Sequence, residues 1–422
     1  MKKKWIMTAA IIILAALTGG CQNKSSGSRK TETSDNRQET TDTKQEGVVD
    51  LLVWGGEEDE ALLQEMFTDF QEAYKDQAEF EITFVAESES TCKDTLMKDL
   101  EEGADVFAFA DDQLNTLVAA GALEPVEQAE QIKAANSPES VAAASVGDTL
   151  YAYPMTADNG YFFYYNKKYF SPEDVASLDK MLEIAAANNK KITMDWSSAW
   201  YVYTFFGNTG LEVGLNEDGI TNYCTWNGTE GPVKGVDVAK AMADLAAHPG
   251  FALLSDSDFM TGVQNGSVIA GINGVWNAVG VEKAWGNDYG AAKLPVYNCG
   301  ETQIQMASFS GYKLAGVNAY SRHHDWAEKL AEWITREENQ RIRFEKRGQG
   351  PSNIKVAESE EIHASPAITA LLEQSEFSCL QRIGGNYWEP VTEFAGKLAE
   401  GNPQGEDLQT LLDKMVEGIT AQ

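Results

Sequence analysis

Alternating apolar and polar positions predict that strands and helices take turns along most of this chain. Residues 48–54 form a strand-like run, and after a Gly-Gly turn apolar side chains recur every three or four positions from 62 to 74. That spacing is typical of a helix with one face on a core. Further strand patterns follow at 80–84, 105–109 and 161–166. This order predicts an α/β fold in which helices cover mostly parallel sheets.

The N-terminal pattern differs from the rest. Lys2, Lys3 and Lys4 precede an apolar run at 5–17, and small residues lead to Cys21. This order is typical of an export signal, and the run is too short to remain as a membrane-spanning helix. Thr18-Gly19-Gly20-Cys21 resembles a lipoprotein cleavage site, which implies a signal peptide at 1–20 and a lipid attached to Cys21. The alternative is ordinary secretion, with Cys21 present by chance.

Residues 22–46 carry no apolar side chain. Such a segment buries too little surface to offset its ordering entropy, so we predict a disordered tether at 21–47. About 375 residues remain, a natural size for two domains. The sequence therefore predicts a globular body that is lipid-anchored at the extracellular face of the cell membrane.

Composition excludes several kinds of partner. The formal net charge of −32 disfavours nucleic acid and anionic lipid surfaces. The cysteines show no zinc spacing, and the His323-His324 pair points to different helix faces, so we expect neither a metal site nor a cofactor. We expect Cys92 to be unpaired, with at most one disulfide among the remaining cysteines, which are Cys224, Cys299 and Cys379.

Candidate binding residues follow from the strand order and from the aromatic residues. Ligands of parallel sheets bind beyond the carboxyl ends of strands, which here points to Glu57, Glu58, Asp112 and Gln113. Aromatic residues gather in the middle of the chain, and core packing is the alternative explanation for each of them. The stronger candidates stand beside glycine-containing turns, namely Trp276 and Trp388.

A series of short segments from residue 48 onwards carries a family resemblance. They are Val53-Trp54, Asp105-Val106-Phe107, Ala119–Leu123, Leu150–Pro154 with Tyr165-Asn166-Lys167, Gly266–Ile269 with Gly274 and Trp276, Ala331–Glu337, and Trp388. In these segments and in their order the chain resembles the extracellular sugar-binding proteins of ABC importers, particularly the maltose/maltodextrin-binding branch.

The resemblance implies a two-lobed fold of the periplasmic-binding-protein type, with a hinge between lobes that closes around a ligand. The N-terminal lobe would comprise 48–156 and 312–360, and the C-terminal lobe 157–311 and 361–422. The resemblance also implies a monomer that delivers an oligosaccharide to the transmembrane subunits of an ABC transporter, with a malto-oligosaccharide as the expected ligand.

The family's sugar contacts are implied residue by residue. Aromatic platforms would be Trp276, Trp388, Trp200, Tyr201 and Phe109. Polar contacts would be Asp112, Gln113, Glu57, Glu58, Asp158 and Asn159. Large flat side chains with a few acids and amides suit a pyranose, which has an apolar face and a rim of hydroxyls. We expect no enzyme activity. The alternatives are a glycan-capturing adhesion lipoprotein and a glycoside hydrolase, which would need paired carboxylates at a scissile bond.

Overall fold

The computed structural model of the protein describes residues 47–421. The predicted signal peptide, Cys21 and all but the last residue of the predicted tether lie outside these residues. Within them, no helix is long and apolar enough to cross a membrane. All four cysteines of the described chain are free, so the prediction that Cys92 is unpaired agrees with the structure.

The first of two five-stranded sheets has the order β2-β1-β3-β17-β6. β1, β2, β3 and β6 run in one direction, and β17 runs against its neighbours β3 and β6. The reversed strand therefore begins at the edge where the parallel strands end. The bounds are β1 Val49–Gly55, β2 Phe80–Ala86, β3 Val106–Ala110, β6 Tyr153–Thr156 and β17 Lys313–Val317.

The second sheet repeats this arrangement in the order β11-β8-β12-β7-β13. β7 is the reversed strand and lies between β12 and β13. The bounds are β7 Tyr161–Asn166, β8 Lys191–Met194, β11 Phe251–Leu253, β12 Val268–Gly274 and β13 Tyr289–Ala292. Short two-stranded pairs complete the strands of the described chain. They are β4 Ser145–Val146 with β5 Thr149–Leu150, β9 Val213–Leu215 with β10 Asn222–Cys224, β14 Val296–Cys299 with β15 Thr302–Gln305, and β16 Ser308–Ser310 with β18 Ser378–Leu380.

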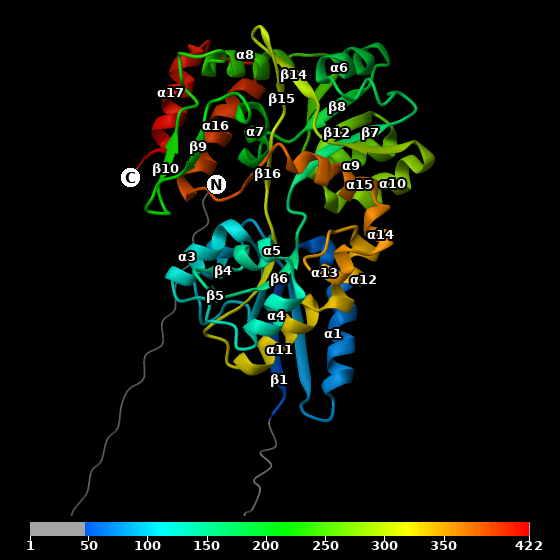
Figure 1. Ribbon diagram of the computed structural model, residues 1–422, viewed down its shortest axis with the longest axis vertical. Coiled ribbons are helices and arrows are strands. Elements are labelled where there is room, and N and C mark those ends of the chain that lie inside the picture. The colour runs from blue at the N-terminus through cyan, green and yellow to red at the C-terminus, as the bar shows by residue number, and fades with distance from the viewer. Residues whose placement is uncertain (1–46, 422) are drawn as a thin grey trace, which may run out of the picture. The chain divides into compact units, whose positions relative to one another are not determined.

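Helices cover both sheets, and Figure 1 shows α1 and α11 beside β1, whereas α8, α16 and α17 gather in the part that holds the second sheet. The apolar stripe predicted at 62–74 lies in α1, where Leu62, Met66 and Phe70 are buried. In chain order the bounds are α1 Glu60–Tyr74, α2 Cys92–Leu96, α3 Leu114–Ala119, α4 Ala129–Ala135, α5 Pro138–Ala143, α6 Leu178–Ala187, α7 Ala199–Phe206, α8 Gly235–Ala246, α9 Asp256–Asn265, α10 Ala278–Trp285, α11 His324–Thr335, α12 Glu337–Arg347, α13 Ile354–Ala357, α14 Glu360–His363, α15 Pro366–Ser375, α16 Trp388–Ala399 and α17 Leu408–Ile419.

Each sheet has its own hydrophobic core. The core of the first sheet draws its buried residues from 49–153 and 314–334. Two clusters cover the second sheet, and their buried residues come from 161–309 and 362–419. The predicted lobe boundaries near 156, 312 and 360 fall between these groups, and the boundaries themselves stay a prediction.

Candidate functional site

Four chain segments meet at the edge of the first sheet where its parallel strands end. β1 leads into the 3-10 helix η1 (Glu57–Asp59), and β3 leads into η2 (Asp111–Gln113). The reversed strand β17 begins here, because Lys313 stands in register with Ala110 and Thr156. The topology thus places a lysine among the acid-bearing loops that follow β1, β3 and β6.

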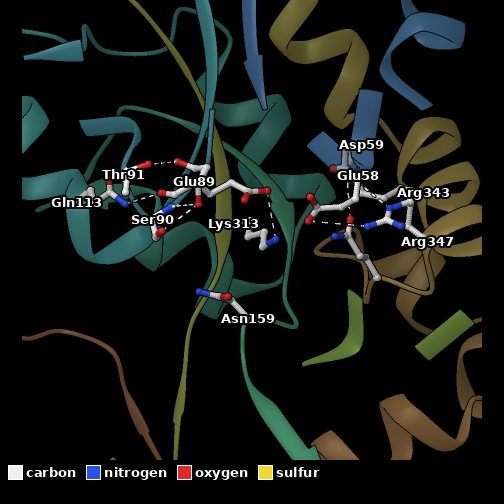
Figure 2. Close-up of polar contacts among 12 residues, drawn as sticks. Glu58, Asp59, Glu89, Ser90, Thr91, Gln113, Asn159, Lys313, Arg343 and Arg347 are labelled. Atoms are coloured by element: carbon white, nitrogen blue, oxygen red, sulfur yellow. Dashed lines mark hydrogen bonds and ion pairs between the residues drawn. The ribbon is translucent and has the colours of Figure 1, made fainter. Parts of the chain in front are cut away.

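Lys313 is a buried cation at this edge, with 6% of its surface exposed. Its Nζ lies 3.2 Å from Oε1 of Glu89, which is 9% exposed. Burial alone would lower the pKa of Lys313, but the carboxylates of Glu89, Asp59 and Asp158 outweigh it and raise the pKa above its usual value. The lysine is therefore charged at neutral pH. Figure 2 shows Lys313 beside Glu89, with Glu58 and Asp59 drawn beyond it.

A second buried ion pair fixes η1. Asp59 pairs with Arg343 of α12, and its other oxygen accepts a hydrogen bond from Nε of Arg347 at 2.9 Å. Burial acts to raise the pKa of Asp59, but the positive charges of Arg343, Lys313 and Arg347 hold that pKa at about 2. Glu58 is exposed and lies 3.9 Å from Arg347. The pair thus holds the start of α1 against α12, so that the loop after β1 is fixed in place.

The loop after β3 carries two acids in different surroundings. Asp111 is buried and accepts a hydrogen bond from the backbone N–H of Tyr312 at 2.9 Å. Burial raises its pKa to about 6. Asp112 is partly exposed and accepts a hydrogen bond from Nε2 of Gln381 at 2.9 Å. Desolvation, together with the charge of Asp111, raises the pKa of Asp112 to about 7. Both carboxyls are therefore partly protonated near neutral pH.

The connection between β6 and β7 contributes Asp158 and Asn159, and both are buried. Asp158 accepts a hydrogen bond from the backbone N–H of Gly350, and burial raises its pKa to about 6. Asn159 donates to Oε1 of Gln381 at 3.5 Å. Gln381 thus joins this connection to Asp112.

Trp276 stands at the matching edge of the second sheet, directly after β12 in the 3-10 helix η3 (Val275–Asn277). Its Nε1 donates to Asp256 at 3.1 Å, and its ring centroid lies 5.9 Å from that of Trp200. The ring folds back over Gly274, where a Cβ atom would lie 2.1 Å from two ring carbons. The Nζ of Lys313 lies 5.5 Å from its centroid. The aromatic ring of one sheet therefore faces the buried cation of the other.

Trp388, partly buried at the start of α16, lines a separate cavity of about 300 Å³. The cavity is also lined by Asp112, Arg382 and the exposed Ile220. An aromatic face beside a carboxyl and an apolar side chain is a suitable lining for a sugar ring. A larger depression of about 540 Å³ lies at the opposite edge of the first sheet, among Asp50, Glu81 and other surface residues. None of the predicted site residues lines it.

The structure brings most of the predicted site residues to the two facing edges. Two exposed carboxylates lie on η1, namely Glu57 and Glu58. The neighbouring connections carry three polar residues, which are Asp112, Asp158 and Asn159. Three tryptophans are partly buried, namely Trp276, Trp200 and Trp388.

Three predicted residues are occupied within the protein. Phe109 is fully buried in the core of the first sheet, and its role as a platform stays a prediction. Tyr201 is 6% exposed, and its hydroxyl donates to Asn273. Gln113 is buried, donates to the carbonyl of Glu89 and accepts from the backbone N–H of Lys93. Gln113 therefore braces the loop that carries Glu89.

Sequence reasoning missed Lys313, Glu89, Asp59 and Asp111. Lys313 and Glu89 are separated by 224 positions, and neither stands in a motif. The signal that would have found Lys313 is its position at the first residue of a strand that is otherwise apolar (KLAGV). A charged residue in an apolar strand is costly unless it is paired.

Comparisons with known proteins agree with this architecture. The sequence profile of the bacterial extracellular solute-binding proteins matches residues 65–370. A galactooligosaccharide-binding protein of Bacillus subtilis (strain 168) is 29% identical over 65% of this chain and 66% of its own length. A maltooligosaccharide ABC transporter solute-binding lipoprotein of Streptococcus pneumoniae serotype 4 is 22% identical over 89% of this chain and 87% of its own length.

Among solved structures, one determined with acarbose has a TM-score of 0.78 and is 30% identical to this chain. The match covers 89% of this chain and 99% of the other. The family comprises solute-binding proteins and not enzymes. The profile match over most of the chain and the paired sheets lead to the same conclusion: the protein is a member of the bacterial extracellular solute-binding family, with its two-lobed α/β fold.

Proposed function

We propose that this protein captures an oligosaccharide between its two sheets, with malto-oligosaccharides as preferred ligands, and delivers it to the transmembrane subunits of an ABC transporter. The observation that carries this proposal is the pair of partly exposed tryptophans, Trp276 and Trp388, each beside polar groups of the first sheet. Trp276 faces Lys313, and Trp388 shares a cavity with Asp112.

The chemistry of a pyranose matches these surroundings. Its C–H face packs on an aromatic ring, and its hydroxyls both donate and accept hydrogen bonds. Aspartic acids that are partly protonated near neutral pH, as Asp111 and Asp112 are, can also do both. We infer that the ligand contacts are Trp276, Trp388, Trp200, Asp112, Glu57, Glu58, Asp158 and Asn159.

Two relatives support the preference for malto-oligosaccharides. The pneumococcal relative is a maltooligosaccharide-binding protein, and the 30% identical structure was determined with acarbose. The Bacillus relative, at 29% identity, binds galactooligosaccharides, which makes these sugars the second candidate.

A thermal-shift panel tests the proposal and separates the two candidates. The purified chain is heated with maltose, maltotriose, maltotetraose, galacto-oligosaccharides, and xylo- or cello-oligosaccharides as controls. A ligand at about 100 times its dissociation constant adds about 2.7 kcal/mol of stability by mass action, which is a readily measured shift. We expect the largest shift with the malto series. If the galacto series gives the largest shift, galacto-oligosaccharides and not malto-oligosaccharides are the preferred ligands. No shift with any sugar would refute the proposal.

Lobe closure is part of the proposal. Apolar sugar faces and their platforms lose water only when the lobes meet, so ligand should shift the hinge toward a closed form. The proposed boundaries are 48–156 with 312–360 and 157–311 with 361–422. Small-angle scattering should show a smaller radius of gyration with a bound sugar. Identical profiles with and without a sugar that binds would refute closure.

We also propose that Cys21 is acylated after removal of residues 1–20, so that the monomeric protein is held at the extracellular face of the cell membrane. The Streptococcus relative is a lipoprotein, which supports this proposal. Cells that express the chain and a Cys21→Ser variant are labelled with a fatty-acid analogue. Label on the wild type alone is expected. Equal labelling of both would refute the assignment of Cys21.

A further inference from the structure

Lys313 has more hydrogen-bonding capacity than the described chain uses. An ammonium group has three N–H donors. Within residues 47–421 its Nζ hydrogen-bonds to Glu89 alone. A buried cation that is incompletely paired is costly. The remaining donors are therefore available to a ligand at the edge of the first sheet.

Unsatisfied acceptors lie at the same edge. Oδ2 of Asp111 and Oδ1 of Asp158 are buried and have no hydrogen-bond partner within the described residues. Lys313 is in register with Ala110 and Thr156, which stand one and two positions before these aspartates. Spare donors and spare acceptors thus occur together, which suits a ligand whose hydroxyls can do both.

The geometry also connects this edge to the aromatic platform. The Nζ of Lys313 lies 5.5 Å from the ring centroid of Trp276. A hydrogen bond to Asp256 holds that ring on its own side, and Gly274 leaves room for it because it has no Cβ. A sugar unit that packs on Trp276 therefore brings its hydroxyl rim close to Lys313. The lysine is thus a charged group of the first sheet that lies against this ring.

We propose that Lys313 is a specificity-determining residue, whose ammonium donates hydrogen bonds to hydroxyls of the sugar unit at Trp276 and restricts that unit to neutral sugars. The inference rests on the proposed function and names the ligand's chemistry more closely. Glu89 already neutralises the lysine, and Glu58 and Asp158 add negative charge around it. A uronic-acid unit would bring a further carboxylate close to Glu89, Glu58 and Asp158, and repulsion between these negative charges disfavours it.

The test removes the cation without leaving a buried charge behind. Lys313→Met alone would leave the buried carboxylate of Glu89 without its cation, so the main variant combines Lys313→Met with Glu89→Gln. Lys355→Met is the matched control, because Lys355 is exposed and pairs with Glu337 at 2.9 Å away from the site. The probes for titration calorimetry are maltotetraose, the matching galacto-oligosaccharide, and both sugars oxidised at C6 to carboxylates.

We expect the wild type to bind a neutral probe and to reject its oxidised form. The double variant should bind the neutral probe about 10- to 100-fold more weakly, the range for a lost hydrogen bond to a charged group. Its melting temperature without ligand should change little, and Lys355→Met should bind as the wild type does. Lys313→Arg should bind with intermediate affinity, because the charge remains but its geometry changes.

Each contrary result has a separate meaning. Wild-type binding with an unchanged affinity of the double variant overturns the role of Lys313 and leaves the proposed function standing. Equal binding of neutral and oxidised probes overturns the restriction to neutral units. No binding of any probe by the wild type overturns both proposals. Should the double variant not fold, an unchanged affinity of Lys313→Arg overturns the inference.

Discussion

Replacing Gly274 by alanine should displace the ring of Trp276 without touching the tryptophan itself. A Cβ at this position would lie 2.1 Å from two carbons of the ring, far inside van der Waals contact. The backbone of Gly274 has φ −89° and ψ 174°, which alanine adopts freely. The new Cβ therefore clashes with the indole ring, and the backbone of β12 can keep its conformation.

The expected cost appears in sugar affinity more than in stability. The displaced ring loses its hydrogen bond to Asp256 at 3.1 Å and its place beside Trp200. If Trp276 is a binding platform, the loss should be about 2 kcal/mol, or roughly 30-fold in affinity, on the scale of interface hot spots. The ring is only partly buried, so the free energy of unfolding should fall by about 1 kcal/mol.

Titration calorimetry of single and double variants checks this reasoning. Because both changes remove the same platform, Gly274→Ala combined with Trp276→Ala should bind no more weakly than Trp276→Ala alone. Gly396→Ala is the control, since Gly396 of α16 has open space where its Cβ would lie and does not line the cavity beside Trp388. Wild-type affinity of Gly274→Ala, or fully additive losses in the double variant, would refute the argument.

Three further outcomes follow from the buried charges and thiols. Arg343→Met should lower the free energy of unfolding by about 1.5–3 kcal/mol, measured in urea, because one oxygen of the buried Asp59 loses its charged partner while Arg347 keeps the other; a loss below about 1 kcal/mol would contradict this. Asp111 and Asp112 have pKa values raised above 3.8 to about 6 and 7, so the folded state binds protons more tightly than the unfolded state, and the free energy of unfolding should rise as pH falls from about 8 to about 5. Asp112→Asn should flatten part of that slope, and an unchanged slope would exclude it as a source. Cys379, the exposed thiol, should react with a maleimide before the other described cysteines, as peptide mapping would show; equal rates would contradict the burial.

The regular parts of the fold could be predicted because they depend on local pattern. The runs at 48–54, 80–84 and 105–109 coincide with β1, β2 and β3 to within two residues at each end, and the apolar stripe at 62–74 lies within α1. The rule that ligands bind beyond the carboxyl ends of parallel strands singled out the loops that carry Asp112 and Glu58, and the structure has both loops directly after β1 and β3. Their role in binding stays a prediction. These predictions needed no information about distant contacts.

The rest of the site depends on contacts between distant segments. Phe109 is a predicted platform by resemblance, and its burial could not be predicted, because it depends on the cover of β3 on both faces. Lys313 escaped attention because β17 runs against its neighbours, and only this reversal brings its first residue to the edge where the parallel strands end. Its partner Glu89 is 224 positions away, and no periodic pattern connects two such residues.

The most direct measurement of the central claim is a calorimetric titration of the wild-type chain and of the Trp276→Ala and Trp388→Ala variants with maltotetraose and with the matching galacto-oligosaccharide. If both tryptophans are sugar platforms, the wild type has a single class of site, and each variant binds about 30-fold more weakly while it keeps its fold. No binding by the wild type, or variants that keep full affinity, would contradict it. A Trp276→Ala variant that unfolds while its folded fraction binds normally would show that this ring belongs to the core.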